Sequence, residues 1–116
     1  VGKREWQLNK EGAEYIVGKS WYARNAMAQC SGNTTGFVKL LSDKSARKIL
    51  GGTIVGSHAA DMIGTIATAM NADTTIRTLA DSVWFHPSRP EAIKEAAAAV
   101  LSKCKINDAG LKRNPE

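Results

Sequence analysis

The chain has 116 residues, of which 43% are hydrophobic and 23% are charged, a size and composition that suit one domain with a modest core. Its 16 basic and 11 acidic residues give a net charge of +5, but the basic residues are spread from Lys3 to Arg113. Because no basic cluster and no apolar run of membrane-spanning length is present, the sequence favours neither a nucleic-acid partner nor a membrane protein.

The cysteines and the chain ends bear on compartment and boundaries. Cys30 and Cys104 form no CxxC pair, and no His lies near them at metal-ligand spacing. We therefore expect two buried thiols in a reducing compartment, and without a secretion signal the cytoplasm is favoured. The opening residues read as the middle of a domain, so we expect a fragment of a longer protein. Its domain would cover residues 1–103, and residues 104–116 would form a polar, mobile tail.

The first half of the chain predicts a hairpin preceded by less regular elements. A short helix is predicted over residues 10–15, ending near Gly18, and residues 20–30 are predicted to be extended, although their alternation is poor. Residues 36–43 and 48–57 are clearer β-prone runs. The polar turn DKSAR joins them at hairpin length, which makes them antiparallel neighbours.

The second half predicts helices. One runs over residues 59–70, and its spacing places four apolar side chains on one face: Ala59, Ile63, Ile66 and Met70. A polar run, Asp73 to Thr75, ends it and can cap a second helix, whose apolar residues are Ile76, Leu79 and Val83. A third helix, from about Arg89 to Lys103, has the apolar stripe Ile93, Ala97, Val100 and Leu101. Its alanines at 96–99 would allow a neighbouring element to approach closely. Strands followed by helices predict an α+β fold with an antiparallel sheet.

Two glycine motifs and one histidine invite functional readings that their spacing does not support. GAEYIVGKS, residues 12–20, has five residues between its glycines where a phosphate loop needs four. GGTIVG has the wrong glycine spacing for a dinucleotide fingerprint and lies within a predicted strand. His58 is expected at a helix N-terminus in a structural role, and a metal site shared with His86 would need more ligands than the sequence offers.

The stretch WFHPSRPEAIKEA, residues 84–96, carries the other histidine. His86 directly precedes Pro87, which would stiffen the backbone that presents the imidazole and makes a cis peptide bond possible. Glu91 follows five residues later and could orient the ring. A structural alternative stays open, because Ser88 and Glu91 also have the spacing of a capping box at a helix N-terminus.

A family resemblance rests on the segment from GFVKLLSD and KILGGTIVGS through the His-Pro motif to the alanine-rich helix. This combination resembles the C-terminal interface domain of the flavin-dependent pyridine nucleotide–disulfide oxidoreductases, among which the dihydrolipoamide dehydrogenases are most similar. The similarity covers about residues 35–101 and extends more weakly back to Gly2. The resemblance implies the interface-domain fold of these reductases.

The resemblance also implies a catalytic pair. His86 stands where the family has its acid–base catalyst, and Glu91 stands where it has the carboxylate that orients that base. Pro87 matches the proline that follows the family's histidine, and this position would place Pro87 near the flavin of a partner subunit. Departures from the pattern affect substrate preference more than the pair: Ser88 for a threonine, Arg89 and Pro90 between the pair, and Trp84 and Phe85 for a small residue and a second histidine.

Cofactors and partners follow from the same resemblance. FAD and NAD would be bound by domains that precede this one, so the isolated chain is expected to bind neither and to be inactive. The implied partners are a second copy of the chain, forming a homodimer, and a lipoyl-bearing acyltransferase. A domain of a glutathione-type or other disulfide reductase and a non-catalytic oligomerisation module remain alternatives.

Overall fold

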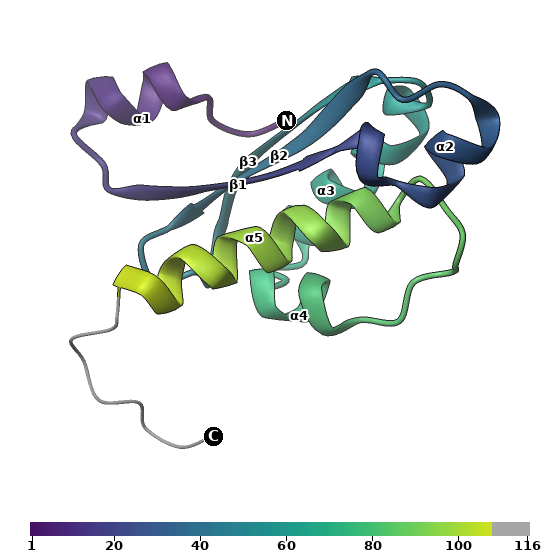
Figure 1. Ribbon diagram of the computed structural model, residues 1–116. Coiled ribbons are helices and arrows are strands. Elements are labelled where there is room, and N and C mark those ends of the chain that lie inside the picture. The colour runs from purple at the N-terminus through teal and green to yellow at the C-terminus, as the bar shows by residue number, and fades with distance from the viewer. Residues whose placement is uncertain (108–116) are drawn as a thin grey trace.

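The computed structural model of the chain describes residues 1–107, and a three-stranded antiparallel sheet forms its centre. The strands, in spatial order, are β1 (Tyr15–Trp21), β2 (Gly36–Asp43) and β3 (Ile49–Gly56). Three helices gather on one side of this sheet (Figure 1): α3 (Ala59–Asn71), α4 (Ile76–Asp81) and α5 (Glu91–Asn107). The prediction of an α+β fold is confirmed.

The predicted hairpin is confirmed as β2 and β3. Leu40 lies opposite Gly52 and Lys39 opposite Thr53, with one register shift between Leu41 and Ser42. The Asp43 carboxylate closes the connecting turn: it accepts hydrogen bonds from the backbone N–H groups of Arg47 at 2.9 Å and Lys48 at 3.0 Å, and from the Ser45 hydroxyl at 2.7 Å. The polar turn residues thus satisfy their own backbone donors.

The helix predicted over residues 10–15 is wrong. A helix, α1 (Glu5–Glu11), forms earlier and ends at Gly12, which has a left-handed backbone with φ of 68°. Residues 15–21 instead form β1 and pair with β2. Gly18, near which that helix was predicted to end, does not end a helix. It lies within the strand, where a β-carbon would overlap the carbonyl oxygen of Ala96 in α5.

The extended segment predicted over residues 20–30 is correct only at its start. After β1 the chain forms a 3-10 turn, η1 (Tyr22–Arg24), and then α2 (Ala26–Ser31). Asn25 caps α2, since its side chain accepts a hydrogen bond from the Ala28 N–H, and Gly32 ends it with φ of 72°. The poor alternation of this segment therefore reflected a helix.

The two middle helices form close to their predicted bounds, but their exposed and buried residues differ from prediction. The buried residues of α3 are Met62, Ile66 and Ala69, while Ile63 and Met70 of the predicted face are only partly buried against the core, so the helix is turned slightly from the predicted face. Thr75 caps α4 as expected, accepting from the Thr78 N–H. Because α4 ends at Asp81, Val83 lies in the following loop and is fully exposed.

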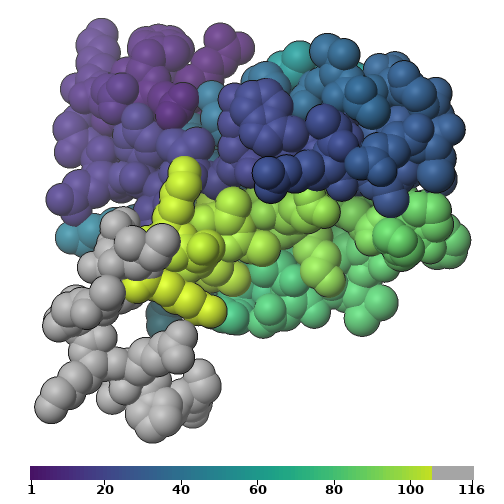
Figure 2. Space-filling view, viewed as in Figure 1, coloured from purple at the N-terminus to yellow at the C-terminus, as the bar shows by residue number. Residues whose placement is uncertain are grey.

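Helix α5 packs against β1 and β2 and runs across the middle of the face seen in Figure 2. It begins at Glu91 and ends at Asn107, four residues beyond the predicted end at Lys103. Ala96 and Ala97 are completely buried, which confirms that the alanine tract lets another element approach. The start of the predicted tail therefore belongs to the helix, and its remaining residues, 108–116, lie outside the described part of the chain.

The expectation of two buried thiols is wrong. Cys30 is exposed at the end of α2, and Cys104, on the last turns of α5, is half-buried with its sulfur 3.7 Å from the Lys44 carbonyl oxygen. Helix α2 turns Cys30 toward solvent, whereas Cys104 packs against the edge of the core and is only partly buried, a difference that sequence spacing could not show. Within residues 1–107, no helix is both long enough and apolar enough to cross a bilayer.

Candidate acid–base site

The loop between α4 and α5 presents the predicted histidine. Trp84 anchors the loop by donating its indole N–H to the Leu79 carbonyl at 3.0 Å, and it packs against the core. The next residue, Phe85, is 79% exposed. The His86–Pro87 peptide bond is cis, one of the two states that the sequence left open.

His86 and Glu91 are in direct contact. The Nδ1 atom of His86 lies 2.9 Å from Oε1 and 3.0 Å from Oε2 of Glu91, so the carboxylate is within hydrogen-bond distance of the ring and can orient it. The imidazole side chain is 70% exposed, whereas the carboxylate is 20% exposed. With Nδ1 bonded to the carboxylate, Nε2 on the opposite side of the ring makes no hydrogen bond to any described residue. The pair thus offers one ring nitrogen to an external group.

The backbone of the loop holds the Glu91 carboxylate. The Ser88 N–H donates to its Oε2 at 2.9 Å. This bond is the main reason that the pKa of Glu91 lies below its ordinary value; partial burial opposes it, and the hydrogen bond and charge of His86 and the charge of Lys94 add to it. A carboxylate that stays charged favours the tautomer with hydrogen on Nδ1 and stabilises the imidazolium when Nε2 takes a proton.

The capping box is half formed. The bond from the Ser88 N–H to the Glu91 carboxylate is present, but α5 begins at Glu91 itself, and the Ser88 hydroxyl makes no hydrogen bond to any residue from 1 to 107. The expectation that this hydroxyl caps the helix is therefore wrong, because two residues separate Ser88 from the first turn. Glu91 therefore has both the structural role and the orienting role, because its one carboxylate accepts hydrogen bonds from the loop backbone and from the imidazole.

The sequence did not single out Asn25, which also reaches this loop. Its side-chain amide donates to the Ser88 carbonyl at 2.9 Å, across 63 positions of sequence. An Asn before a run of helix-forming residues was a local signal for a helix cap. No local pattern indicates the second contact, because only the fold brings the two segments together.

Neither His58 nor the glycine motif of β3 forms a second functional site in this structure. His58 is the exposed first residue before α3, with Nδ1 3.2 Å from the Asp61 carboxylate. The chain described here contains no group of three His, Cys, Asp or Glu side chains placed to hold a metal ion. Protein atoms already occupy the space beside the β3 glycines: a β-carbon on Gly52 would lie 2.8 Å from the Ile66 side chain. These glycines therefore do not fit a dinucleotide.

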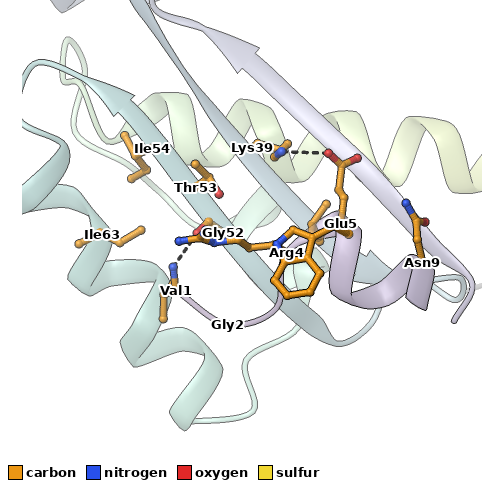
Figure 3. Close-up of a pocket in the computed structure, with 12 residues that line it drawn as sticks. Val1, Gly2, Arg4, Glu5, Asn9, Lys39, Gly52, Thr53, Ile54 and Ile63 are labelled. Carbon is orange, nitrogen blue, oxygen red and sulfur yellow. Dashed lines mark hydrogen bonds and ion pairs between the residues drawn. The ribbon is translucent and has the colours of Figure 1, made fainter. Parts of the chain in front are cut away.

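A separate groove of about 930 Å³ lies between α1 and the sheet face that is turned away from α5 (Figure 3). Lys39 and Glu5 form an ion pair of 3.0 Å at its side, and the Val1 amino group donates to the Gly52 carbonyl at 2.9 Å. None of residues 84–91 lines the groove. It is distinct from the His86–Glu91 pair.

Known proteins share this sequence and fold. The model of the pyridine nucleotide-disulphide oxidoreductase dimerisation domain matches residues 1–97. The chain is 42% identical to mitochondrial dihydrolipoyl dehydrogenase 1 of Arabidopsis thaliana over 103 residues, which cover 89% of this chain and 20% of that protein. It is 38% identical to mitochondrial dihydrolipoyl dehydrogenase of Homo sapiens over 107 residues, covering 92% and 21%.

Solved structures agree with these relatives. The HOCl-induced flavoprotein disulfide reductase of Escherichia coli superposes with a TM-score of 0.80 at 26% identity, over 86% of this chain and 23% of that one. The chain thus spans about a fifth of the length of the curated relatives that it matches. Since the family model covers most of the chain, the chain belongs to the pyridine nucleotide-disulphide oxidoreductase family, as its dimerisation domain.

Proposed function

We propose that this domain serves a dihydrolipoyl dehydrogenase-like flavoprotein disulfide reductase, with His86 as its acid–base catalyst and Glu91 as the residue that orients the imidazole. The observation that carries the proposal is the contact of 2.9 Å between His86 Nδ1 and Glu91 Oε1, beside a ring that is 70% exposed. A structural histidine would need neither an oriented ring nor an accessible second nitrogen.

The chemistry of dithiol oxidation requires such a base. A thiolate attacks a disulfide far better than a thiol does, so the proton of the incoming thiol must be removed. In the proposed step, His86 Nε2 takes that proton as the thiol sulfur bonds to one sulfur of the disulfide and the other sulfur leaves as a thiolate. Glu91 stabilises the imidazolium that forms. In the reverse reaction, the imidazolium returns the proton.

The disulfide and the cofactors would come from outside this chain. Cys30 and Cys104 lie on different helices and are not joined in a disulfide, so neither reads as half of a redox pair. A dimerisation domain suits an arrangement in which His86 faces the disulfide of a second subunit and Pro87 lies near that subunit's flavin. Preceding domains would hold FAD and NAD, which supply the electron transfer, because the glycines described here do not fit a dinucleotide.

The proposed substrate class is a lipoyl dithiol, with a lipoyl-bearing acyltransferase as a further partner. The support is the higher identity to dihydrolipoyl dehydrogenases, 42% and 38%, than to the Escherichia coli disulfide reductase, at 26%. The cytoplasm remains our expectation for the compartment, although the Arabidopsis and human relatives are named as mitochondrial proteins.

The test is His86→Gln in the complete enzyme, assayed as two half-reactions by stopped flow. Proton transfer by a positioned side chain contributes typically about 10²–10⁴-fold, so reduction of the disulfide by a dithiol should slow by that order. Hydride exchange between nicotinamide and flavin requires no thiol deprotonation and should stay nearly unchanged. Glu91→Gln should give an intermediate rate in the dithiol half, because the base remains but loses its charged partner.

The matched control is His58→Gln, which makes the same change in the chain's other histidine, directly before α3. It should leave both half-reactions unchanged. Equal losses in both halves for His86→Gln would indicate general damage to the dimer, and an unchanged dithiol half would show that His86 is not the base.

A further inference from the structure

Two buried polar side chains hold the backbone on either side of Glu91. Buried polar residues are rare in the described part of the chain, which contains three: Ser20, Asn25 and Ser42. The Ser20 hydroxyl donates to the Ala92 carbonyl at 2.5 Å, and the Asn25 amide donates to the Ser88 carbonyl. Because a buried polar group costs free energy unless it is hydrogen-bonded, these contacts define where the loop and the start of α5 must lie.

Asn25 uses both ends of its side-chain amide. Its Oδ1 accepts from the Ala28 N–H at 3.0 Å and caps α2, while its Nδ2 donates to the Ser88 carbonyl at 2.9 Å and lies 3.4 Å from that of Arg89. The side chain is 2% exposed. A Ser, Thr or Asp would serve equally well as the cap, but none of them offers a neutral N–H donor on the opposite side.

The contact at Ser88 leads directly to the His86–Glu91 pair. Asn25 binds the carbonyl of Ser88, and the N–H of the same residue donates to Glu91 Oε2 at 2.9 Å. That carboxylate is in turn bonded to His86 Nδ1. Ser88 is therefore held on one side by a buried side chain from the β1–α2 connection, and on the other it holds the carboxylate that orients the imidazole.

We propose that Asn25 is a positioning residue for the His86–Glu91 pair, acting through Ser88. The catalytic consequence rests on the proposed function, whereas the effect on the Ser88 N–H does not. Losing the tether would let residues 88–89 move and weaken the bond that holds the carboxylate. Since small displacements of catalytic groups lower rates strongly, dithiol reduction should slow by about 5- to 20-fold.

The decisive variant is Asn25→Ser, which keeps the cap on α2 but no longer reaches the Ser88 and Arg89 carbonyls. Asn25→Thr is the second variant, because it fills more of the vacated space if the serine variant folds poorly. Thr75→Ala is the control: it removes the cap of α4, a helix whose cap does not touch the loop. The first readout is the Ser88 amide in the ¹⁵N-labelled 116-residue chain, by its proton chemical shift and hydrogen-exchange rate. The second is the stopped-flow dithiol half-reaction of the complete enzyme.

In the Asn25 variants we expect the Ser88 amide proton to move upfield and exchange at least about 10-fold faster, since its bond to the carboxylate weakens. Thr75→Ala should leave both readouts unchanged. An unchanged Ser88 amide in a folded Asn25 variant would overturn the inference even if His86→Gln confirms the base. If the amide responds but His86→Gln leaves dithiol reduction intact, the tether stands and the proposed function fails.

Discussion

Gly18→Ala provides the sharpest test of the packing between β1 and α5. Gly18 lies within β1, and a β-carbon there would overlap the Ala96 carbonyl oxygen and a Val100 methyl and would lie 2.8 Å from the Val100 backbone nitrogen. Two of these three atoms belong to the backbone of α5 and cannot rotate away. The helix must therefore shift as a unit, and it carries Glu91 at its start.

The magnitude follows from two opposing terms. Replacing Gly by Ala restricts the unfolded chain and stabilises the fold by about 0.5–1 kcal/mol where the site accepts a methyl group. Overpacking costs typically about 1–3 kcal/mol, and a clash with backbone favours the upper end. We expect a net destabilisation of about 2 kcal/mol, or a fall in Tm of about 8 °C at roughly 4 °C per kcal/mol for a domain of this size.

Gly64→Ala is the matched control, because it makes the identical change within α3, where a β-carbon would meet nothing within 4 Å beyond the backbone of its own helix. It should stabilise the fold by about 0.5–1 kcal/mol, since Ala is the better helix former. Urea and thermal unfolding of the 116-residue chain, followed by circular dichroism, measure both variants. A Gly18→Ala variant as stable as the wild type would refute the close packing of α5 on β1.

Two further predictions concern the hairpin turn and acid stability. Asp43→Ala removes an acceptor of three hydrogen bonds and should lower the free energy of unfolding by about 1–2 kcal/mol in urea titrations. Asp43→Asn keeps one acceptor oxygen and should lose less. Equal losses in the two variants would contradict the role of Asp43 as the acceptor that closes the turn. The pKa of Glu91 is lowered in the fold, so its stabilisation is complete above its ordinary pKa of 4.5 and is lost as pH falls through the folded value. The urea midpoint of the wild type should therefore fall more between neutral pH and about pH 3 than that of Glu91→Gln. Parallel curves for the two proteins would show that the carboxylate gains nothing from its partners.

Local chemistry alone predicted the hairpin and the three later helices, whereas the pairing of His86 with Glu91 was implied by the family resemblance. The hairpin and the helices depend on interactions within a few residues: a polar turn between β-prone runs, and apolar residues at helical spacing. The alanine tract was informative as well, since four small side chains in a row predicted that another element would approach α5. Such signals need no knowledge of distant residues.

The tertiary structure decided what Gly18, Asn25 and Ser88 do. In the sequence, Gly18 indicated the end of a short helix, but in the fold its missing side chain leaves space for α5, which begins more than 70 positions later. Asn25 indicated at most a local cap, yet its other hydrogen bonds reach the loop beside the acid–base pair. The Ser88 hydroxyl had the spacing of a cap but lies too far before α5. Each outcome depends on which distant backbone atoms fill the space around the residue, and sequence spacing contains no record of that packing.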